Sequence, residues 1–232
     1  ARSTSSRAWP RARSRAEPRG RMGALSPDSK FYRGLSTATD LVIVNLLTLA
    51  AFIPVVTAGA ALTACARVCG ETAREEDGYL VRTWWAAFRK NLVQSMGWWI
   101  PCAILLGSGA AESWLLSGIG DSRLAGALNG LLIVGLAAVL GILSWIAPLQ
   151  AFFENTAIGH MRNAAVLAGG YLWRTLANVA VALAPMAVFL AVPRARMAAA
   201  WFVAIIGVAF TMYMQAFIEK TALDRLLEAA RN

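Results

Sequence analysis

The sequence predicts an all-α polytopic membrane protein, a transmembrane helical bundle of five to six membrane segments with cytoplasmic interfacial helices. The 232-residue chain is 58% hydrophobic and only 15% charged, whereas soluble domains are roughly 45–50% apolar and about 25% charged. Charged residues are absent from five long stretches, and Lys and Arg gather in alternate connections between them. The five stretches are residues 41–66, 91–111, 124–153, 175–193 and 197–218.

Each stretch is about as long as a membrane span, because about 20 helical residues cross a hydrocarbon core of roughly 30 Å. A very apolar soluble bundle is the alternative. Its helices would keep a polar stripe at a period of about 3.6 residues, and Leu131–Leu143 has none. The expected membrane segments are about 36–56, 57–68 (short or re-entrant), 92–116, 124–150, 175–193 and 197–218.

The chain begins with a basic segment, residues 1–28, which we expect to be a disordered cytoplasmic tail before a single transmembrane domain over residues 29–232. Residues 1–22 contain seven Arg and one acidic residue, a composition that cannot bury a core. A transit peptide, or residues translated upstream of a start at Met22, are the alternatives.

The first apolar unit is interrupted, because Pro54 removes a backbone donor and Gly59 follows it. One alternative is a single tilted helix over residues 36–68, and the other is a hairpin. Lys and Arg stay on the cytoplasmic side of membrane segments. The hairpin, with both termini cytoplasmic, places 19 of them inside and 3 outside, whereas one span with the N-terminus inside gives 12 and 10. The charge distribution favours the hairpin.

Residues 79–92 predict an amphipathic helix on the inner leaflet, which enters the next span at Asn91. Its apolar residues recur at helical spacing, and Trp and basic residues favour the headgroup zone. A partner protein covering the same stripe is the alternative. Residues 155–173 repeat the pattern more weakly. The candidate interfacial anchors are Trp84, Trp85, Phe88, Arg89 and Lys90.

Two blocks of residues give the chain a resemblance to the YesL-like family of bacterial membrane proteins, whose domain has no known function. The resemblance covers roughly residues 29–228, and it departs from the family at Phe152, where a basic residue is expected. The first block includes Asp40-Leu41, Asn45-Leu46-Leu47, Ile53–Ala60, Asp77-Gly78-Tyr79 and Trp85–Asn91, and the second includes Phe153-Glu154-Asn155-Thr156, Arg162-Asn163-Ala164 and Arg174-Thr175-Leu176.

The resemblance implies a function by association. Genes of this family typically lie beside genes for carbohydrate ABC transporters, which implies an accessory or regulatory role in carbohydrate uptake with transporter subunits as partners. It also implies a multi-pass protein of the bacterial plasma membrane. The family has no established catalytic residues, so the resemblance assigns none to this chain.

Five polar residues in the expected spans are candidate sites. A polar side chain within a span is costly and either bonds to another helix or marks a pathway for a solute. One interpretation pairs Asp40 with an Arg such as Arg67 and makes it a polar lock or part of a substrate path. The alternative is a helix cap together with an interhelical hydrogen bond from Asn45. The amides either join helices or line a polar pocket. The five candidates are Asp40, Asn45, Asn129, Gln150 and Gln215.

Several function classes find no support in the sequence. An enzyme needs a nucleophile–base pair or a metal set, and His160 has no partner at short spacing. Cys65, Cys69 and Cys102 form no CxxC pair, so we expect no metal and no cofactor. The basic tail fits anionic lipid better than nucleic acid. We therefore expect a non-enzymatic membrane protein whose main partner is the bilayer, with a small transporter or channel for a polar solute as the alternative.

Overall fold

The computed structural model describes residues 30–76, 78–118 and 123–231, and within these ranges it contains helices and no strand. Residues 1–36 and 37–232 form two units by their internal contacts, and the second unit is described below. In this described part of the chain, five helical segments are long and apolar enough to cross a membrane. The predicted all-α, multi-pass fold is confirmed, whereas the expected tail over residues 1–28 lies outside the described residues.

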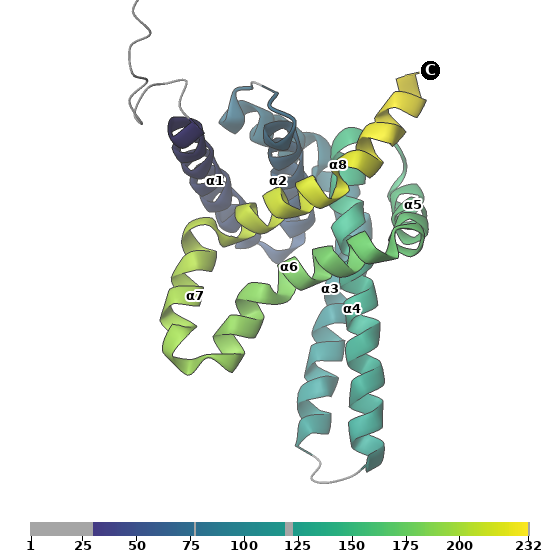
Figure 1. Cartoon of the computed structure of the whole chain (residues 1–232). Coiled ribbons are helices and arrows are strands. Elements are labelled where there is room, and N and C mark those ends of the chain that lie inside the picture. Colours follow the sequence, from purple (N-terminus) through teal and green to yellow (C-terminus); the bar gives the residue numbers. More distant parts are fainter. Residues whose placement is uncertain (1–29, 77, 119–122, 232) are drawn as a thin grey trace, which may run out of the picture. The chain divides into compact units, whose positions relative to one another are not determined.

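The first apolar unit folds as a hairpin. Helix α1 (Lys30–Phe52) ends before Pro54, the short helix η1 (Val55–Thr57) follows, and α2 (Ala58–Ala73) runs back in the opposite direction (Figure 1). The Thr57 hydroxyl stabilises the turn by donating to the Ala51 carbonyl at 2.5 Å. A single helix over residues 36–68 is therefore wrong.

Helix α2 is the buried centre of the bundle rather than a full span. Twelve of its sixteen residues are buried. Most of them are small, which lets the neighbouring helices approach closely. A Cβ on Gly59 would lie 2.6 Å from the Cβ of Trp99 on the next helix, so only glycine fits there. Helix α2 thus covers residues 58–68 of the expected segment at residues 57–68, continues to Ala73, and is enclosed by protein.

A long hairpin follows, made of α3 (Leu80–Ser117) and α4 (Arg123–Phe152). Helix α3 has 38 residues and extends about 57 Å at about 1.5 Å per residue, which exceeds the bilayer core. The expected interfacial helix over residues 79–92 is continuous with the span that we expected to begin at residue 92. The separate helix that we predicted on the membrane surface is therefore the first part of α3.

The second half of the chain contains α5 (Ala157–Gly170), α6 (Leu172–Ala191), η2 (Pro193–Ala195), α7 (Arg196–Phe202), the π-helix η3 (Val203–Gly207) and α8 (Val208–Arg231). Helix α5 begins at a Thr156 cap, whose hydroxyl accepts from the Gly159 N–H at 3.1 Å. The predicted amphipathic stretch at 155–173 thus contains a separate helix. The chain changes direction between α7 and α8 (Figure 1).

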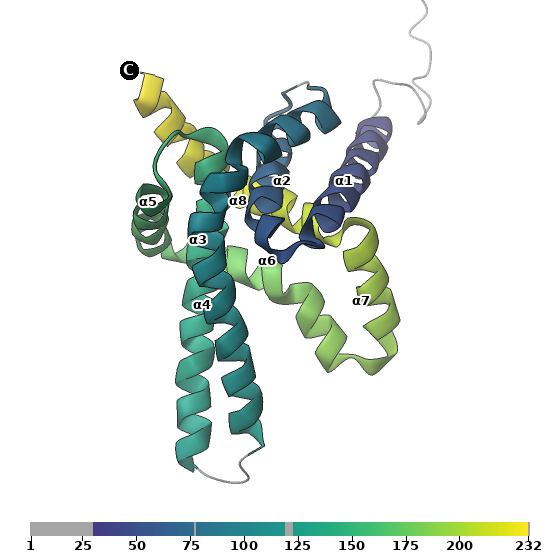
Figure 2. The same cartoon turned by 180° about the vertical axis from the view of Figure 1, so that it is seen from behind.

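The connections lie on two sides of the unit formed by residues 37–232. The ends of α2, α4 and α8 lie on one side, whereas the end of α3, the start of α4 and the α6–α7 turn lie on the other (Figures 1 and 2). This alternation is the one expected for a hairpin at Pro54. Two clusters of buried side chains hold the helices together, one around Val44, Cys65 and Trp84 and the other around Trp98, Trp145 and Leu223.

Candidate functional site

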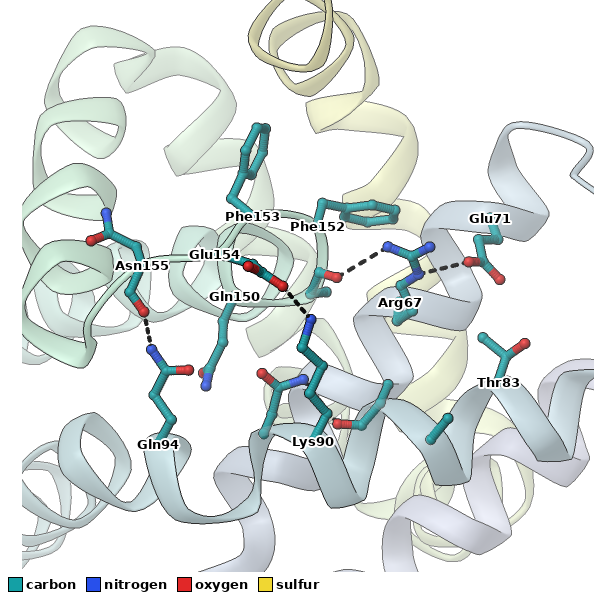
Figure 3. A pocket seen from close by; sticks show the side chains of 14 residues that line it. Arg67, Glu71, Thr83, Lys90, Gln94, Gln150, Phe152, Phe153, Glu154 and Asn155 are labelled. Carbon is teal, nitrogen blue, oxygen red and sulfur yellow. Dashed lines mark hydrogen bonds and ion pairs between the residues drawn. The ribbon is translucent and has the colours of Figure 1, made fainter. Parts of the chain in front are cut away.

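A polar pocket lies between the end of α2, the first half of α3 and the end of α4 (Figure 3). Its volume is about 570 Å³, within the range of roughly 300–1,000 Å³ that is usual for small-molecule sites. The two blocks that carry the family resemblance meet in it. The first supplies Ala86, Ala87, Lys90 and Asn91, and the second supplies Phe153, Glu154 and Asn155. The lining residues are Arg67, Glu71, Thr83, Ala86, Ala87, Lys90, Asn91, Gln94, Gln150, Ala151, Phe152, Phe153, Glu154 and Asn155.

The charged groups of the pocket are paired. Arg67 Nε lies 2.6 Å from Glu71 Oε1, one turn along α2, and Lys90 Nζ lies 2.8 Å from Glu154 Oε1 across the pocket (Figure 3). The hydrogen bond and the charge of Lys90 lower the pKa of the Glu154 carboxyl below its ordinary value. Two cations and two carboxylates leave these four groups with no net charge, so the pocket suits a neutral polar group better than a free ion.

Gln150 forms the buried floor of the pocket. Its Oε1 accepts from Trp98 Nε1 at 2.5 Å and from the hydroxyls of Thr63 and Ser95, each at 3.4 Å. Its Nε2 is buried and has no partner among the described residues. A buried donor without a partner costs free energy, so a hydrogen-bond acceptor bound in the pocket would satisfy it. Gln94 Nε2 closes the rim by donating to the Asn155 carbonyl.

Phe152 occupies the position where the resemblance predicts a basic residue. Its ring lies between two guanidinium groups, with Arg67 Cζ at 4.6 Å and Arg74 Cζ at 4.7 Å from the ring centre. Arg67 lies on α2 and Arg74 directly follows its last residue, and an aromatic face attracts cations at this distance. Gly70 makes room for the ring, since a Cβ there would lie 2.7 Å from Phe152 Cζ. The two arginines thus place positive charge next to residue 152, where the resemblance predicts a basic side chain.

Asn45 connects α1 to the π-helix. Its Nδ2 donates to the carbonyls of Val203 and Ala204 at 3.2 and 3.0 Å, and its Oδ1 accepts from the N–H groups of Val208 and Ala209 at 2.9 and 3.1 Å. The amide is fully buried. It replaces backbone bonds that a regular helix would make, and such an insertion bends a helix. The structure gives Asn45 a bonding role between helices.

The other predicted polar residues do not share a cavity with Gln150. Asn129 accepts from the Ser113 hydroxyl at 2.7 Å in the outer part of the α3–α4 hairpin. Gln215 is buried and donates to the Asn178 carbonyl at 3.1 Å. The expected pairing of Asp40 with Arg67 is wrong, because Arg67 bonds instead to Glu71 and to the Ala151 carbonyl.

The predicted interfacial anchors separate into two groups. Trp84 is only 2% exposed, and its Nε1 donates to the Thr48 hydroxyl at 3.2 Å. The prediction that Trp84 anchors the protein at the membrane surface is therefore wrong, because its side chain faces the protein core. Phe88 packs partly against the same core. Trp85 is 52% exposed, and Arg89 and Lys90 are exposed as well.

Sequence reasoning missed a second buried polar cluster. Glu219 is 1% exposed and Asn178 is fully buried, and Asn178 Nδ2 donates to Glu219 Oε1. The sequence feature that could have revealed this cluster is the four-residue spacing of Gln215 and Glu219, which places them on one face of a helix. Ending the expected span at residue 218 left Glu219 outside it.

The described residues of the pocket offer hydrogen-bonding groups to a ligand. No group of three His, Cys, Asp or Glu side chains in the described part of the chain lies close enough together to hold a metal ion. The pocket offers amides, paired charges and two aromatic rings, and it lacks a Cys or His that would act as nucleophile or base. These groups recognise hydroxyl and amide groups through hydrogen bonds.

A comparison with protein families gives a match over part of the chain. Residues 41–108 match a family described as "Protein of unknown function, DUF624". No curated protein and no solved structure matches the chain. The matched region is similar to a family without a known function, and it supplies the α2 and α3 walls of the pocket.

Proposed function

We propose that the chain is a non-enzymatic accessory or regulatory protein for carbohydrate uptake in a bacterial plasma membrane, and that a carbohydrate ABC-transporter subunit docks at the polar pocket. One observation carries the proposal: the two sequence blocks that resemble the family both contribute residues to the same pocket. The distribution of Lys and Arg favours a cytoplasmic position for this side of the molecule.

The rim of the pocket fits a protein partner. Lys90 and Glu154 have side chains that are 68% and 87% exposed, and an exposed ion pair contributes little to folding. The two groups are therefore able to exchange partners at little cost.

Co-purification with carbohydrate ABC-transporter subunits from the source bacterium tests the proposal. The intact chain, purified in a mild detergent, should retain the transporter subunits. Lys90→Glu should reduce the recovered subunits about tenfold, since it places two like charges together at the rim. Arg194→Glu is the matched control, because Arg194 is exposed in the turn on the opposite side. Recovery of the chain alone, or equal losses in both variants, would refute the proposal.

A second candidate is a small transporter or channel for a polar solute. The unpartnered Nε2 of Gln150 at the floor of the pocket favours it. In reconstituted liposomes, Gln150→Leu should reduce the uptake of a neutral sugar, whereas Asn129→Leu should not, because Asn129 lies away from the pocket. Uptake that is equal with and without the protein would exclude transport and leave docking.

A further inference from the structure

Glu219 on α8 has an unusual environment for a carboxyl group. Its side chain is 1% exposed, and helices α4 and α6 supply polar neighbours. Asn178 Nδ2 on α6 donates to Glu219 Oε1 and lies 3.4 Å from Ser144 Oγ on α4. Gln215, one turn earlier on α8, donates its Nε2 to the Asn178 carbonyl at 3.1 Å.

None of the ion pairs found in the described residues includes Glu219. The cations around it bond elsewhere. Arg74, which directly follows α2, pairs with Asp224 at 2.9 Å and donates to the Gly70 carbonyl, and Arg174 of α6 donates to the Ile218 carbonyl at 3.0 Å. Lys220 of α8 donates to the Ala73 carbonyl at 3.0 Å. A buried carboxyl without a paired cation avoids the cost of charge burial by binding a proton.

The surroundings of Glu219 accommodate that proton. Gln215 Oε1 and Asn178 Oδ1 are buried acceptors without a partner among the described residues. Gln215 and Glu219 share a small cavity with Ser144 and Arg74, whose Nη2 is also buried and unpartnered. The cavity holds about 10 Å³, which is roughly one water molecule with several polar partners.

We propose that Glu219 is a proton-binding site in the helical bundle, and that one water molecule in the adjacent cavity joins its hydroxyl to Gln215 and Arg74. The site is separate from the polar pocket and does not depend on the proposed function. It lies one side chain away from the pocket, because Phe152 lines both cavities.

Infrared spectroscopy of the full chain in detergent at neutral pH tests the proposal. The wild-type protein should show the carbonyl band of a protonated carboxylic acid, and the band should shift in heavy water. Glu219→Gln should abolish most of it, whereas Glu228→Gln should leave it unchanged, because Glu228 is exposed on the same helix. Absence of the band at neutral pH, or a band that persists in Glu219→Gln, would overturn the proposal.

Thermal unfolding gives an independent readout. Glutamine has the shape and the donor of a protonated glutamic acid, so Glu219→Gln should unfold within a few degrees of the wild type. Glu219→Ala should unfold at a clearly lower temperature, because it leaves Asn178 Nδ2 without its acceptor. If Glu219→Gln fails to fold or is as unstable as Glu219→Ala, the carboxyl is ionised and the proposal is wrong.

Discussion

Replacing Asn45 by alanine should destabilise the protein more than any other single amide substitution in the expected spans. The Asn45 side chain makes four hydrogen bonds to the backbone around the π-helix. Alanine provides none of them, and the N–H groups of Val208 and Ala209 then lose their acceptor. These groups lie beside Gly207 and Ala209, which are buried, so water cannot easily replace the amide.

The structure gives a magnitude for this loss. Hydrogen bonds between membrane helices are worth about 0.6 kcal/mol on average, so four of them give about 2.4 kcal/mol. Removing a shared partner adds the cost of unsatisfied groups, about 1–3 kcal/mol for each group that stays buried. Since the helix is able to relax and recover part of its regular bonding, we expect a total loss of about 2.5–4 kcal/mol.

Equilibrium unfolding of the purified protein by denaturant, in detergent, measures the loss. Asn129→Ala is the matched control, because it removes an amide that accepts a hydrogen bond from the Ser113 hydroxyl, and it should cost under about 1 kcal/mol. Equal stabilities for the two variants would show that the bend between α7 and α8 does not need the amide. The inferred bonding role of Asn45 would then be wrong.

Three further predictions follow from single contacts. Gly70→Ala should cost about 1–3 kcal/mol, because its Cβ would overlap the Phe152 ring, whereas Gly169→Ala, with nothing within 4 Å, should be neutral or stabilising. Burial lowers the pKa of His160. As the pH falls below about 6.5, the unfolded chain therefore takes up a proton before the folded protein does, and the folded protein loses stability. The unfolding temperature should depend less on pH in His160→Gln than in the wild type. Trp84→Phe keeps most of the packing and removes one buried hydrogen bond, which should lower the free energy of unfolding by about 1 kcal/mol.

The membrane segments were predictable because lipid imposes a simple requirement on sequence. A span needs an unbroken apolar run, and a connection on the cytoplasmic side needs Lys or Arg. Pro54 and the charge distribution together predicted the turn that separates α1 from α2. The boundaries were less certain, since α3 continues through residues 80–117 without a break at Asn91.

The side of each helix that faces protein was harder to predict. Trp84 and Trp85 are neighbours in one apolar stripe, yet one is buried and the other is half-exposed. A stripe facing lipid and a stripe facing protein have the same composition, because both surroundings are apolar. The contact between α3 and the end of α4 brings Lys90, Gln150 and Glu154 into one pocket. Spacing along the chain does not reveal that contact.

The continuity of α3 has a mechanical consequence. From Lys90 at the pocket to Ser117 at its far end, the helix continues for about 40 Å and contains Pro101. Pro101 removes one backbone hydrogen bond, yet the helix continues through it, so a small tilt imposed at the pocket end would be carried to the opposite face of the bilayer. Binding at one membrane surface would thereby shift the end of α3 at the other surface.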